Sequence, residues 1–218
     1  MNHCRLYLIS PPAIELPKFA ESLKAAFDGG DVGSFQLRLK NASDAEVMKA
    51  AEKLIPICHA HGTAFIMNDR PDLAVKCGAD GVHLGQEDLE TMPISKAREI
   101  IGEQSIIGVS CHDSRHLAMD AGEAGADYVA FGAFYPTKSK DAAKLAKYGV
   151  PTAEILSWWA ENTVLPCVAI GGMTPANSAP LAKAGADFIA VITAVWEHPD
   201  GPKKAVEEFN RAIERTAI

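Results

Sequence analysis

The tripeptide Gly-Ala-Asp occurs three times in the chain, each time between a stretch typical of a helix and an apolar run typical of a strand. The copies lie in CGADGVHLG (77–85), AGADYVAFG (124–132) and AGADFIAVI (184–192). The glycine suits the position just past a helix end, where a positive φ is needed. The following run is apolar on both faces, as in a parallel strand covered on both sides. The repeat therefore predicts alternating helices and strands.

The same alternation runs through the whole chain. The predicted strands are Arg5–Ser10, Ser34–Leu39, Thr63–Met67, Gly81–Leu84, Ser105–Val109, Tyr128–Phe131, Cys167–Ile170 and Phe188–Ile192. The predicted helices are Pro17–Phe27, Ser43–Ala60, Pro71–Lys76, Ile94–Ile101, Ser114–Glu123, Thr152–Glu161, Pro175–Lys183 and Lys203–Glu214. Such a pattern predicts an α/β protein with a (β/α)8 TIM barrel as a single domain over residues 1–218. A doubly wound sheet would share the spacing, but the even count and the absence of G-x-G-x-x-G favour a closed barrel.

The three repeated aspartates, Asp80, Asp127 and Asp187, stand where strands are predicted to begin. In such barrels the N-terminal face carries stability, and chemistry takes place at the C-terminal face. We therefore interpret these three residues as structural.

The composition narrows the class of protein. The 218 residues are 48% hydrophobic and 22% charged, which favours a folded core over disorder. The net charge of −7 argues against a nucleic-acid or anionic-membrane surface. Five dispersed cysteines without a C-x-x-C pair suit a reducing cytoplasm. With no apolar run of about 20 residues and no room for a signal peptide before Pro11, we expect a soluble cytoplasmic protein.

The segment QLRLK (36–40) forms the end of the predicted second strand and the residue after it. Alternation places Gln36, Arg38 and Lys40 on one face and Leu37 and Leu39 on the other. Two cations and an amide on an inward face would form a pocket for a polyanion. The alternative is a solvated strand face, which fits a central barrel strand poorly.

Oxygen-bearing side chains follow the next two strands: Asn68 and Asp69 after the third, and Gln86 and Asp88 after the fourth. Mg²⁺ usually takes one or two carboxylates, with substrate phosphates and water completing its ligands. The sequence therefore predicts an Mg²⁺ site held by Asp69 and Asp88, and Glu87 stays open as a further ligand.

A structural interpretation of these two aspartates competes with the metal site. Asp69 would pair with Arg70 or cap the helix that opens at Pro71, and Asp88 would be a loop acid. The occurrence of both carboxylates beside a cationic strand favours the metal site.

Two predicted strands end in further functional groups. Ser110 offers a hydroxyl at the end of the fifth strand, and His112 is open as an acid, a base or a loop residue. His83 lies within the fourth strand and is interpreted as a packed interior residue. After the sixth strand, Thr137, Ser139 and Lys140 supply two hydroxyls and a cation, as a phosphate site needs.

The long loop after the sixth strand is a candidate lid, and its Lys144 and Lys147 are interpreted as solvated. The seventh strand ends in Gly171-Gly172 and the eighth in Ile192-Thr193. Loops 7 and 8 often build the phosphate site of such barrels, and glycine lets the backbone approach a ligand closely. The expected rim thus holds one site for a diphosphate with Mg²⁺ and one for a monophosphate.

Five segments in order resemble the thiamine-phosphate synthase family: QLRLK, NDRPDLAVKCGADGVHLGQED, GVSCH, YPTKSK and AIGGM. The resemblance runs from Tyr7 to about Trp196. It implies a transferase that joins hydroxymethylpyrimidine diphosphate to thiazole monophosphate, through a pyrimidine methyl cation. The products would be thiamine monophosphate and diphosphate.

The resemblance also implies residue roles. Gln36, Arg38, Lys40, Asn68, Ser110 and Lys140 would contact the pyrimidine diphosphate, with Lys140, Ser110 and Arg38 as catalytic residues that stabilise the leaving group. Asp69 and Asp88 would bind Mg²⁺. The thiazole phosphate would lie against Thr137, Ser139, Gly172, Ile192 and Thr193. The partners are then small phosphorylated molecules, with no nucleic acid and no membrane, and a homo-oligomer stays open.

Some positions depart from the family pattern. Ser139 stands where threonine is usual, and Pro11-Pro12 makes the first rim loop stiffer and uncharged. Two rival functions remain. A thiazole tautomerase would use a histidine near the sixth-strand loop and would not need both aspartates; YPTKSK has no histidine. A phosphate-binding barrel without turnover is separated from a synthase only by an assay.

Overall fold

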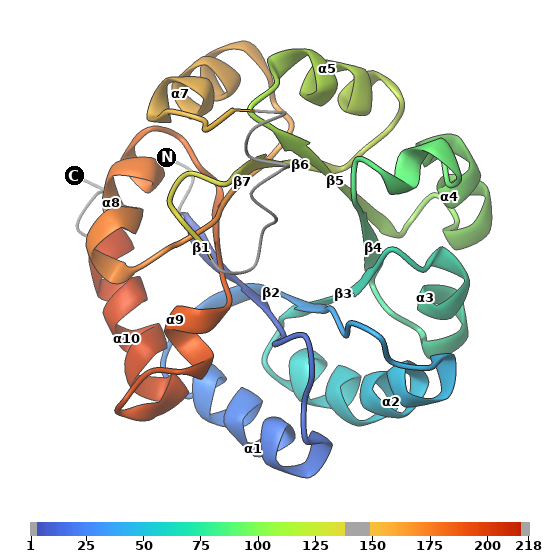
Figure 1. The fold of residues 1–218 in the computed structure, drawn as a ribbon, viewed down its shortest axis with the longest axis vertical. Coiled ribbons are helices and arrows are strands. Elements are labelled where there is room, and N and C mark those ends of the chain that lie inside the picture. The colour runs from blue at the N-terminus through green and yellow to red at the C-terminus, as the bar shows by residue number, and fades with distance from the viewer. Residues whose placement is uncertain (1–3, 138–148, 215–218) are drawn as a thin grey trace.

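The computed structural model describes residues 4–137 and 149–214, and its strands form a closed parallel barrel (Figure 1). The strands are β1 (Arg5–Ile9), β2 (Val32–Leu37), β3 (Ala64–Asn68), β4 (Gly81–Leu84), β5 (Ile106–His112), β6 (Tyr128–Gly132), β7 (Cys167–Ile170) and β8 (Phe188–Val191). They pair in chain order, and β8 closes the ring against β1. The predicted (β/α)8 barrel is thereby confirmed.

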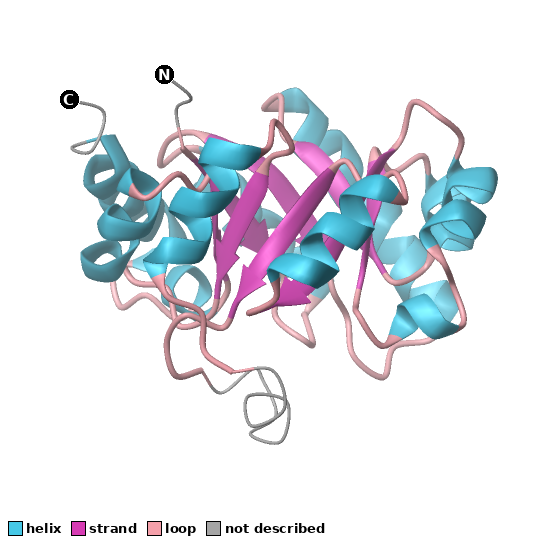
Figure 2. Cartoon of the chain, turned by 90° about the horizontal axis from the view of Figure 1, so that it is seen from above, coloured by secondary structure: helices cyan, strands magenta, loops and turns pink. Residues whose placement is uncertain are grey.

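Helices surround the barrel on the outside, as the side view in Figure 2 shows together with Figure 1. The helices are α1 (Leu16–Phe27), α2 (Asp44–Ala60), α3 (Pro71–Cys77), α4 (Ile94–Ile101), α5 (Arg115–Glu123), α7 (Ala153–Asn162), α8 (Pro175–Lys183), α9 (Thr193–Trp196) and α10 (Gly201–Glu214). All eight predicted helices are present within three residues of their expected bounds. The sequence did not predict the short α9 or a 3-10 turn at Asp88–Glu90. Within the described ranges, no helix has the length and apolar character needed to cross a membrane.

The second strand ends earlier than predicted, at Leu37 instead of Leu39. Beyond Leu37 the backbone turns to the loop after β1. The N–H of Arg38 donates to Oγ of Ser10, and the N–H of Lys40 donates to the carbonyl of Pro12, both at 2.8 Å. The first rim loop therefore holds the chain that carries the two cations.

The three repeated aspartates are structural, as predicted. Each one joins the start of its own strand to the preceding strand through two hydrogen bonds with a single residue of that strand. The aspartate carboxylate accepts the backbone N–H of that residue, and the aspartate N–H donates to its carbonyl. The pairs are Asp80 with Phe65, Asp127 with Ile107, and Asp187 with Cys167, with carboxylate distances of 2.7, 2.7 and 2.8 Å. The glycines of the repeat, Gly78, Gly125 and Gly185, have φ values of 72°, 95° and 108°, which confirms their place after the helices.

Two apolar layers make up the core. The larger layer lies between the strands and the helices. The smaller one fills the barrel interior and consists of Tyr7, Ile9, Ile66, Tyr128, Ala130, Val168 and Ala190. Because this interior is packed, the barrel has a floor beneath its C-terminal rim.

Candidate active site

The loops after β2, β3, β4 and β5 enclose a cavity of about 520 Å³ at the C-terminal rim, called here the polar pocket. Its lining comprises Ile9, Gln36, Arg38, Lys40, Asn68, Asp69, His83, Gly85, Gln86, Glu87, Asp88, Ser110, His112, Ile170 and Ile192. The structure thus brings together every predicted site residue of the second to fifth strands. Such convergence follows from the parallel strands, whose carboxyl ends share one face.

A neighbouring cavity of about 300 Å³, called here the glycine pocket, lies at the ends of β6, β7 and β8. It brings together the predicted residues Thr137, Gly172, Ile192 and Thr193. Ile170 and Ile192 line both pockets, so the two cavities share an apolar wall. Ser139 and Lys140, and the rest of the predicted lid, lie outside the described residues.

The glycine pocket depends on a close backbone approach at Gly172. Its φ of 63° lies in the left-handed region, and a Cβ built on it would lie 2.6 Å from the carbonyl oxygen of Pro136. Only glycine combines that φ with that approach at little cost. The loop after β7 is therefore shaped to leave its backbone exposed to the cavity beside Thr137.

The polar pocket places two carboxylates against one backbone segment at Gly85. The N–H of Gly85 donates to Oδ1 of Asp69 at 3.3 Å. A Cβ built on Gly85 would lie 2.4 Å from Oδ2 of Asp88 and 3.9 Å from Oδ1 of Asp69. A larger residue at position 85 would therefore displace the Asp88 carboxylate from its present place against this backbone segment.

Asp69 is under electrostatic and conformational strain. Burial, followed by the negative charge of Asp88, raises the pKa of Asp69 to about 6. The Arg38 guanidinium opposes this rise. Asp69 also has a φ of 59°, a left-handed value that aspartate tolerates better than most residues. Strained residues with perturbed pKa values gather at functional sites.

The structural alternatives for Asp69 are wrong. Arg70 pairs with Asp44 and Asp72, at 2.6 and 2.8 Å. Arg70 is also the N-cap residue of α3, and no side chain caps this helix, so Asp69 does not serve as its cap. Asp69 is instead contacted by its neighbour Asn68, whose amide nitrogen donates to Oδ2. Its carboxylate therefore belongs to the pocket and not to the helix.

The donor set of the polar pocket fits a hard divalent cation. Burial and then the nearby negative charge of Asp88 raise the pKa of Asp69, and a bound cation would offset both effects. Oε1 of Gln86 is buried and has no hydrogen-bond partner among the described residues. No group of three His, Cys, Asp or Glu side chains suited to a metal occurs in residues 4–137 and 149–214. Any cation here would thus depend on two carboxylates supplemented by neutral oxygens, water or phosphate.

His83 has more contacts than the packed interior residue that the sequence predicted. It is buried, with 9% of its surface exposed, yet it lines the polar pocket. Its Nε2 lies 2.9 Å from Oγ of Ser110, and its Nδ1 lies 2.9 Å from the hydroxyl of Tyr128. Tyr128 is 45 residues away in the chain, so sequence spacing gave no signal for this contact.

His112 also lines the polar pocket and is 8% exposed. It follows an irregularity in the pairing of β5 with β6, and its φ is 53°. The bulge re-aims the end of β5. β5 extends three residues beyond its predicted end at Val109, because His112 still pairs with Phe131 after the bulge.

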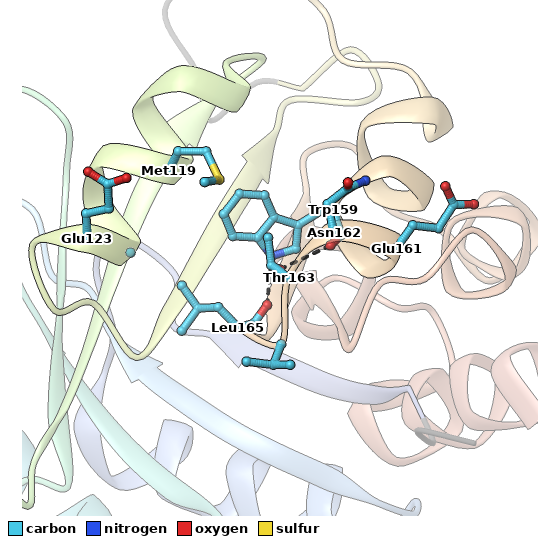
Figure 3. Close-up of a pocket in the computed structure, with 9 residues that line it drawn as sticks. Met119, Glu123, Trp159, Glu161, Asn162, Thr163 and Leu165 are labelled. Atoms are coloured by element: carbon cyan, nitrogen blue, oxygen red, sulfur yellow. Dashed lines mark hydrogen bonds between the residues drawn. The ribbon is translucent and has the colours of Figure 1, made fainter.

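A larger hollow of about 610 Å³ lies elsewhere, between α5 and α7 (Figure 3). It is lined largely by apolar groups, including Met119, Trp159 and the fully exposed Val164. The Trp159 indole N–H is already used, since it donates to the carbonyl of Leu165 at 2.7 Å. Leu165 precedes β7, which places this hollow toward the N-terminal end of the strands, away from both rim pockets. Its size exceeds that of the polar pocket, but the charged residues in its lining are two acids, Glu123 and Glu161, which lie on opposite sides of it.

Comparisons with known proteins agree with the geometry. The family model described as thiamine monophosphate synthase matches residues 6–195. A thiamine-phosphate synthase of Rhodospirillum centenum is 54% identical over 213 residues, covering 98% of this chain and 99% of that protein. One of Hyphomonas neptunium is 46% identical, covering 98% and 95%. The solved thiamine phosphate pyrophosphorylase of Pyrococcus furiosus has a TM-score of 0.84 at 35% identity, covering 100% of this chain and 98% of that one.

Proposed function

The chain belongs to the thiamine monophosphate synthase family, and from that premise we propose how its residues carry the reaction. As a transferase of thiamine biosynthesis, it condenses hydroxymethylpyrimidine diphosphate with thiazole monophosphate, giving thiamine monophosphate and diphosphate. The observation that carries the residue assignment is the pair of adjoining pockets, one with cations and carboxylates and one with an exposed glycine backbone.

The pyrimidine diphosphate would occupy the polar pocket. Arg38 and Lys40 supply positive charge, and Ser110 and Asn68 supply hydrogen-bonding groups. Loss of diphosphate builds negative charge on the leaving group, so preorganised cations accelerate this step more than a general base would. Lys140 is assigned to the same leaving group on the resemblance alone.

Asp69 and Asp88 would hold Mg²⁺ in this pocket. The bound ion would neutralise charge on the departing diphosphate. The proposal is supported by the approach of the two carboxylates at Gly85 and by the raised pKa of Asp69. Glu87 lines the pocket as well, and the geometry assigns it no ligand role.

The thiazole monophosphate would occupy the glycine pocket. Its phosphate would contact the Thr137 hydroxyl and the backbone at Gly172 and Thr193. Ser139 is assigned to the same phosphate on the resemblance alone. The wall formed by Ile170 and Ile192 lies between the two phosphate regions. The thiazole nitrogen and the pyrimidine methylene would meet there, where apolar side chains exclude water from a reactive cation.

The test is formation of thiamine monophosphate by the purified protein, measured with both substrates in Mg²⁺ and in EDTA. We expect product only with Mg²⁺. Equal rates in EDTA would contradict the metal assignment. Absence of product from folded protein that binds the pyrimidine diphosphate would favour a binding barrel.

The cellular setting is also a proposal. The dispersed free thiols suit a cytoplasmic location, and the partners are small phosphorylated molecules. Cell fractionation tests the location, and light scattering of the purified chain tests whether it forms a homo-oligomer.

A further inference from the structure

One continuous chain of six hydrogen bonds joins seven side chains across the floor of the polar pocket. In order, they are Ser110, His83, Tyr128, Tyr7, Gln36, Asn68 and Asp69. The first six side chains come from β5, β4, β6, β1, β2 and β3. The chain thus runs through the barrel interior from a proposed diphosphate contact to a proposed metal ligand.

The direction of the chain is fixed at its Asp69 end. An ionised carboxylate only accepts, so Asn68 presents its amide nitrogen to Asp69 and its Oδ1 to Gln36. Gln36 donates from Nε2 to that Oδ1 at 2.7 Å. Its Oε1 therefore faces the Tyr7 hydroxyl, 3.4 Å away, and must accept from it.

The single proton on each tyrosine hydroxyl extends this donor-to-acceptor direction as far as His83. Burial raises the pKa of Tyr7 and of Tyr128 above the ordinary phenol value, so each keeps a single proton. Tyr7 gives its proton to Gln36, and its oxygen must then accept from Tyr128 across the 2.8 Å contact. Tyr128 has no second proton, so it accepts from Nδ1 of His83 at 2.9 Å.

The same argument sets the direction of the hydrogen bond between His83 and Ser110. A neutral imidazole with its proton on Nδ1 has an acceptor at Nε2. Ser110, at 2.9 Å, must therefore donate its only proton to His83. Its Oγ then offers lone pairs, and no proton, to the pocket.

We propose that Tyr7 and Tyr128 are positioning residues. They extend the donor-to-acceptor direction set at Asp69 along the hydrogen bonds to Ser110, and they thereby hold His83 as the Nδ1–H tautomer in the ligand-free protein. Neither tyrosine lines the polar pocket. They act by fixing which atom of Gln36, His83 and Ser110 faces a ligand.

A second step follows for ligand binding, and it rests on the proposed function. A diphosphate oxygen only accepts, so it needs the proton of Ser110. The Ser110, Tyr128 and Tyr7 hydroxyls must then rotate, and His83 must exchange its Nδ1 proton with solvent for one on Nε2. No group gains or loses a net proton. Oε1 of Gln36 loses the Tyr7 proton in this state, so occupancy at Ser110 is coupled to the hydrogen bonding of Gln36.

The first experiment reads the His83 tautomer by NMR of the full chain labelled with ¹⁵N-histidine, at pH 8, with His83→Gln to assign the signals. We expect a protonated, pyrrole-like Nδ1 in the ligand-free protein. In Tyr7→Phe, Tyr128 loses its acceptor and turns its proton to Nδ1, so the proton moves to Nε2. A wild-type Nε2–H tautomer, or an unchanged tautomer in folded Tyr7→Phe, would overturn the proposal.

Two further variants keep this test decisive. Gln36→Met removes the acceptor of the Tyr7 proton and should move the His83 proton to Nε2 in the same way, if Tyr7→Phe does not fold. Tyr135→Phe is the matched control, because the Tyr135 hydroxyl donates to the carbonyl of Asn177, outside the chain. It should leave the His83 signals unchanged, and a tautomer change there would count against the assignment.

The second experiment adds inorganic diphosphate with Mg²⁺ to the wild-type protein. We expect the His83 proton to move to Nε2; calorimetric binding with no tautomer change would refute the reversal. Tyr7→Phe already holds the Nε2–H tautomer, so inorganic diphosphate should bind it without a further tautomer change, and the KM for the thiazole substrate should stay unchanged. If the wild-type protein makes no product but the ligand-free tautomer and its response to Tyr7→Phe are as expected, the proposed function fails and the positioning role stands.

Discussion

The backbone N–H of Gly85 donates to Oδ1 of Asp69 at 3.3 Å, which joins the loop after β4 to the loop after β3. This bond draws Asp69 toward Asp88, whose carboxylate lies against the same glycine. The two like charges are held together by the fold at a cost. That cost is the physical signature of a cation site, and it can be measured without substrate.

Asp69→Asn should stabilise the metal-free protein above pH 6. The folded pKa of Asp69, about 6, lies above the 3.8 of a free aspartate, so ionisation of Asp69 lowers stability as pH rises from about 4 to about 6. The full shift corresponds to about 3 kcal/mol, and partial exposure reduces the expected gain to about 1–2 kcal/mol at pH 8. Urea unfolding in EDTA at pH 8 and pH 5 checks this, with about half the gain at pH 5.

The same variant should lose Mg²⁺-dependent turnover, so stability and activity would change in opposite directions. Asp120→Asn is the control, because Asp120 is an exposed residue of α5 and should show neither effect. An Asp69→Asn protein that is less stable than wild type at pH 8 would contradict the destabilising effect of burying the Asp69 carboxylate beside Asp88.

Gly85→Ala should weaken Mg²⁺ binding while the barrel still folds. The new methyl group would lie 2.4 Å from Oδ2 of Asp88, so the carboxylate must move away from Asp69. We expect the Mg²⁺ concentration for half-maximal activity to rise about tenfold, the effect of about 1.4 kcal/mol of lost binding. Gly122→Ala on α5 is a matched control, since its Cβ would meet only Leu165 at 3.4 Å. Unchanged Mg²⁺ dependence in Gly85→Ala would remove Asp88 from the site.

Much of this arrangement could be predicted from the sequence because strand ends converge in a parallel barrel. The alternation in QLRLK grouped Gln36, Arg38 and Lys40, and all three line the polar pocket although β2 ends at Leu37 and the two cations follow it in the loop. The repeated Gly-Ala-Asp marked the opposite, structural face. Those inferences need only local periodicity and the rule that parallel strands share a rim.

The contacts that orient the site residues could not be predicted from local periodicity. Periodicity gave the strand of His83 but not its partner Tyr128, which comes from a strand two places further along the chain. Likewise, nothing local indicated that Asp69 would adopt a φ of 59° or meet the N–H of Gly85. These contacts depend on the closure and relative register of the strands, which the sequence pattern leaves open.

Ser10→Ala tests whether the first rim loop positions the cations. Oγ of Ser10, a buried residue with 2% exposure, accepts the N–H of Arg38 at 2.8 Å. Without it that donor loses its partner, at a cost of about 1–3 kcal/mol, and the segment leading to Lys40 shifts. We expect a severalfold higher KM for the pyrimidine diphosphate and an unchanged KM for the thiazole monophosphate. Ser22→Ala, on the outer helix α1, serves as the control, and an equal rise in both KM values would argue for a general loss of structure.

Gly172→Ala tests the second pocket in the opposite sense. With a φ of 63° and a Cβ position 2.6 Å from the Pro136 carbonyl oxygen, alanine would force the loop after β7 away from the loop after β6. The thiazole phosphate would lose its backbone contacts, so its KM should rise at least tenfold, while inorganic diphosphate should still bind the polar pocket with its original affinity. Steady-state kinetics with each substrate varied in turn and calorimetry with diphosphate separate the two effects. Parallel weakening at both pockets would show that Gly172 supports the barrel rim as a whole, and the assignment of the thiazole phosphate to the glycine pocket would then fail.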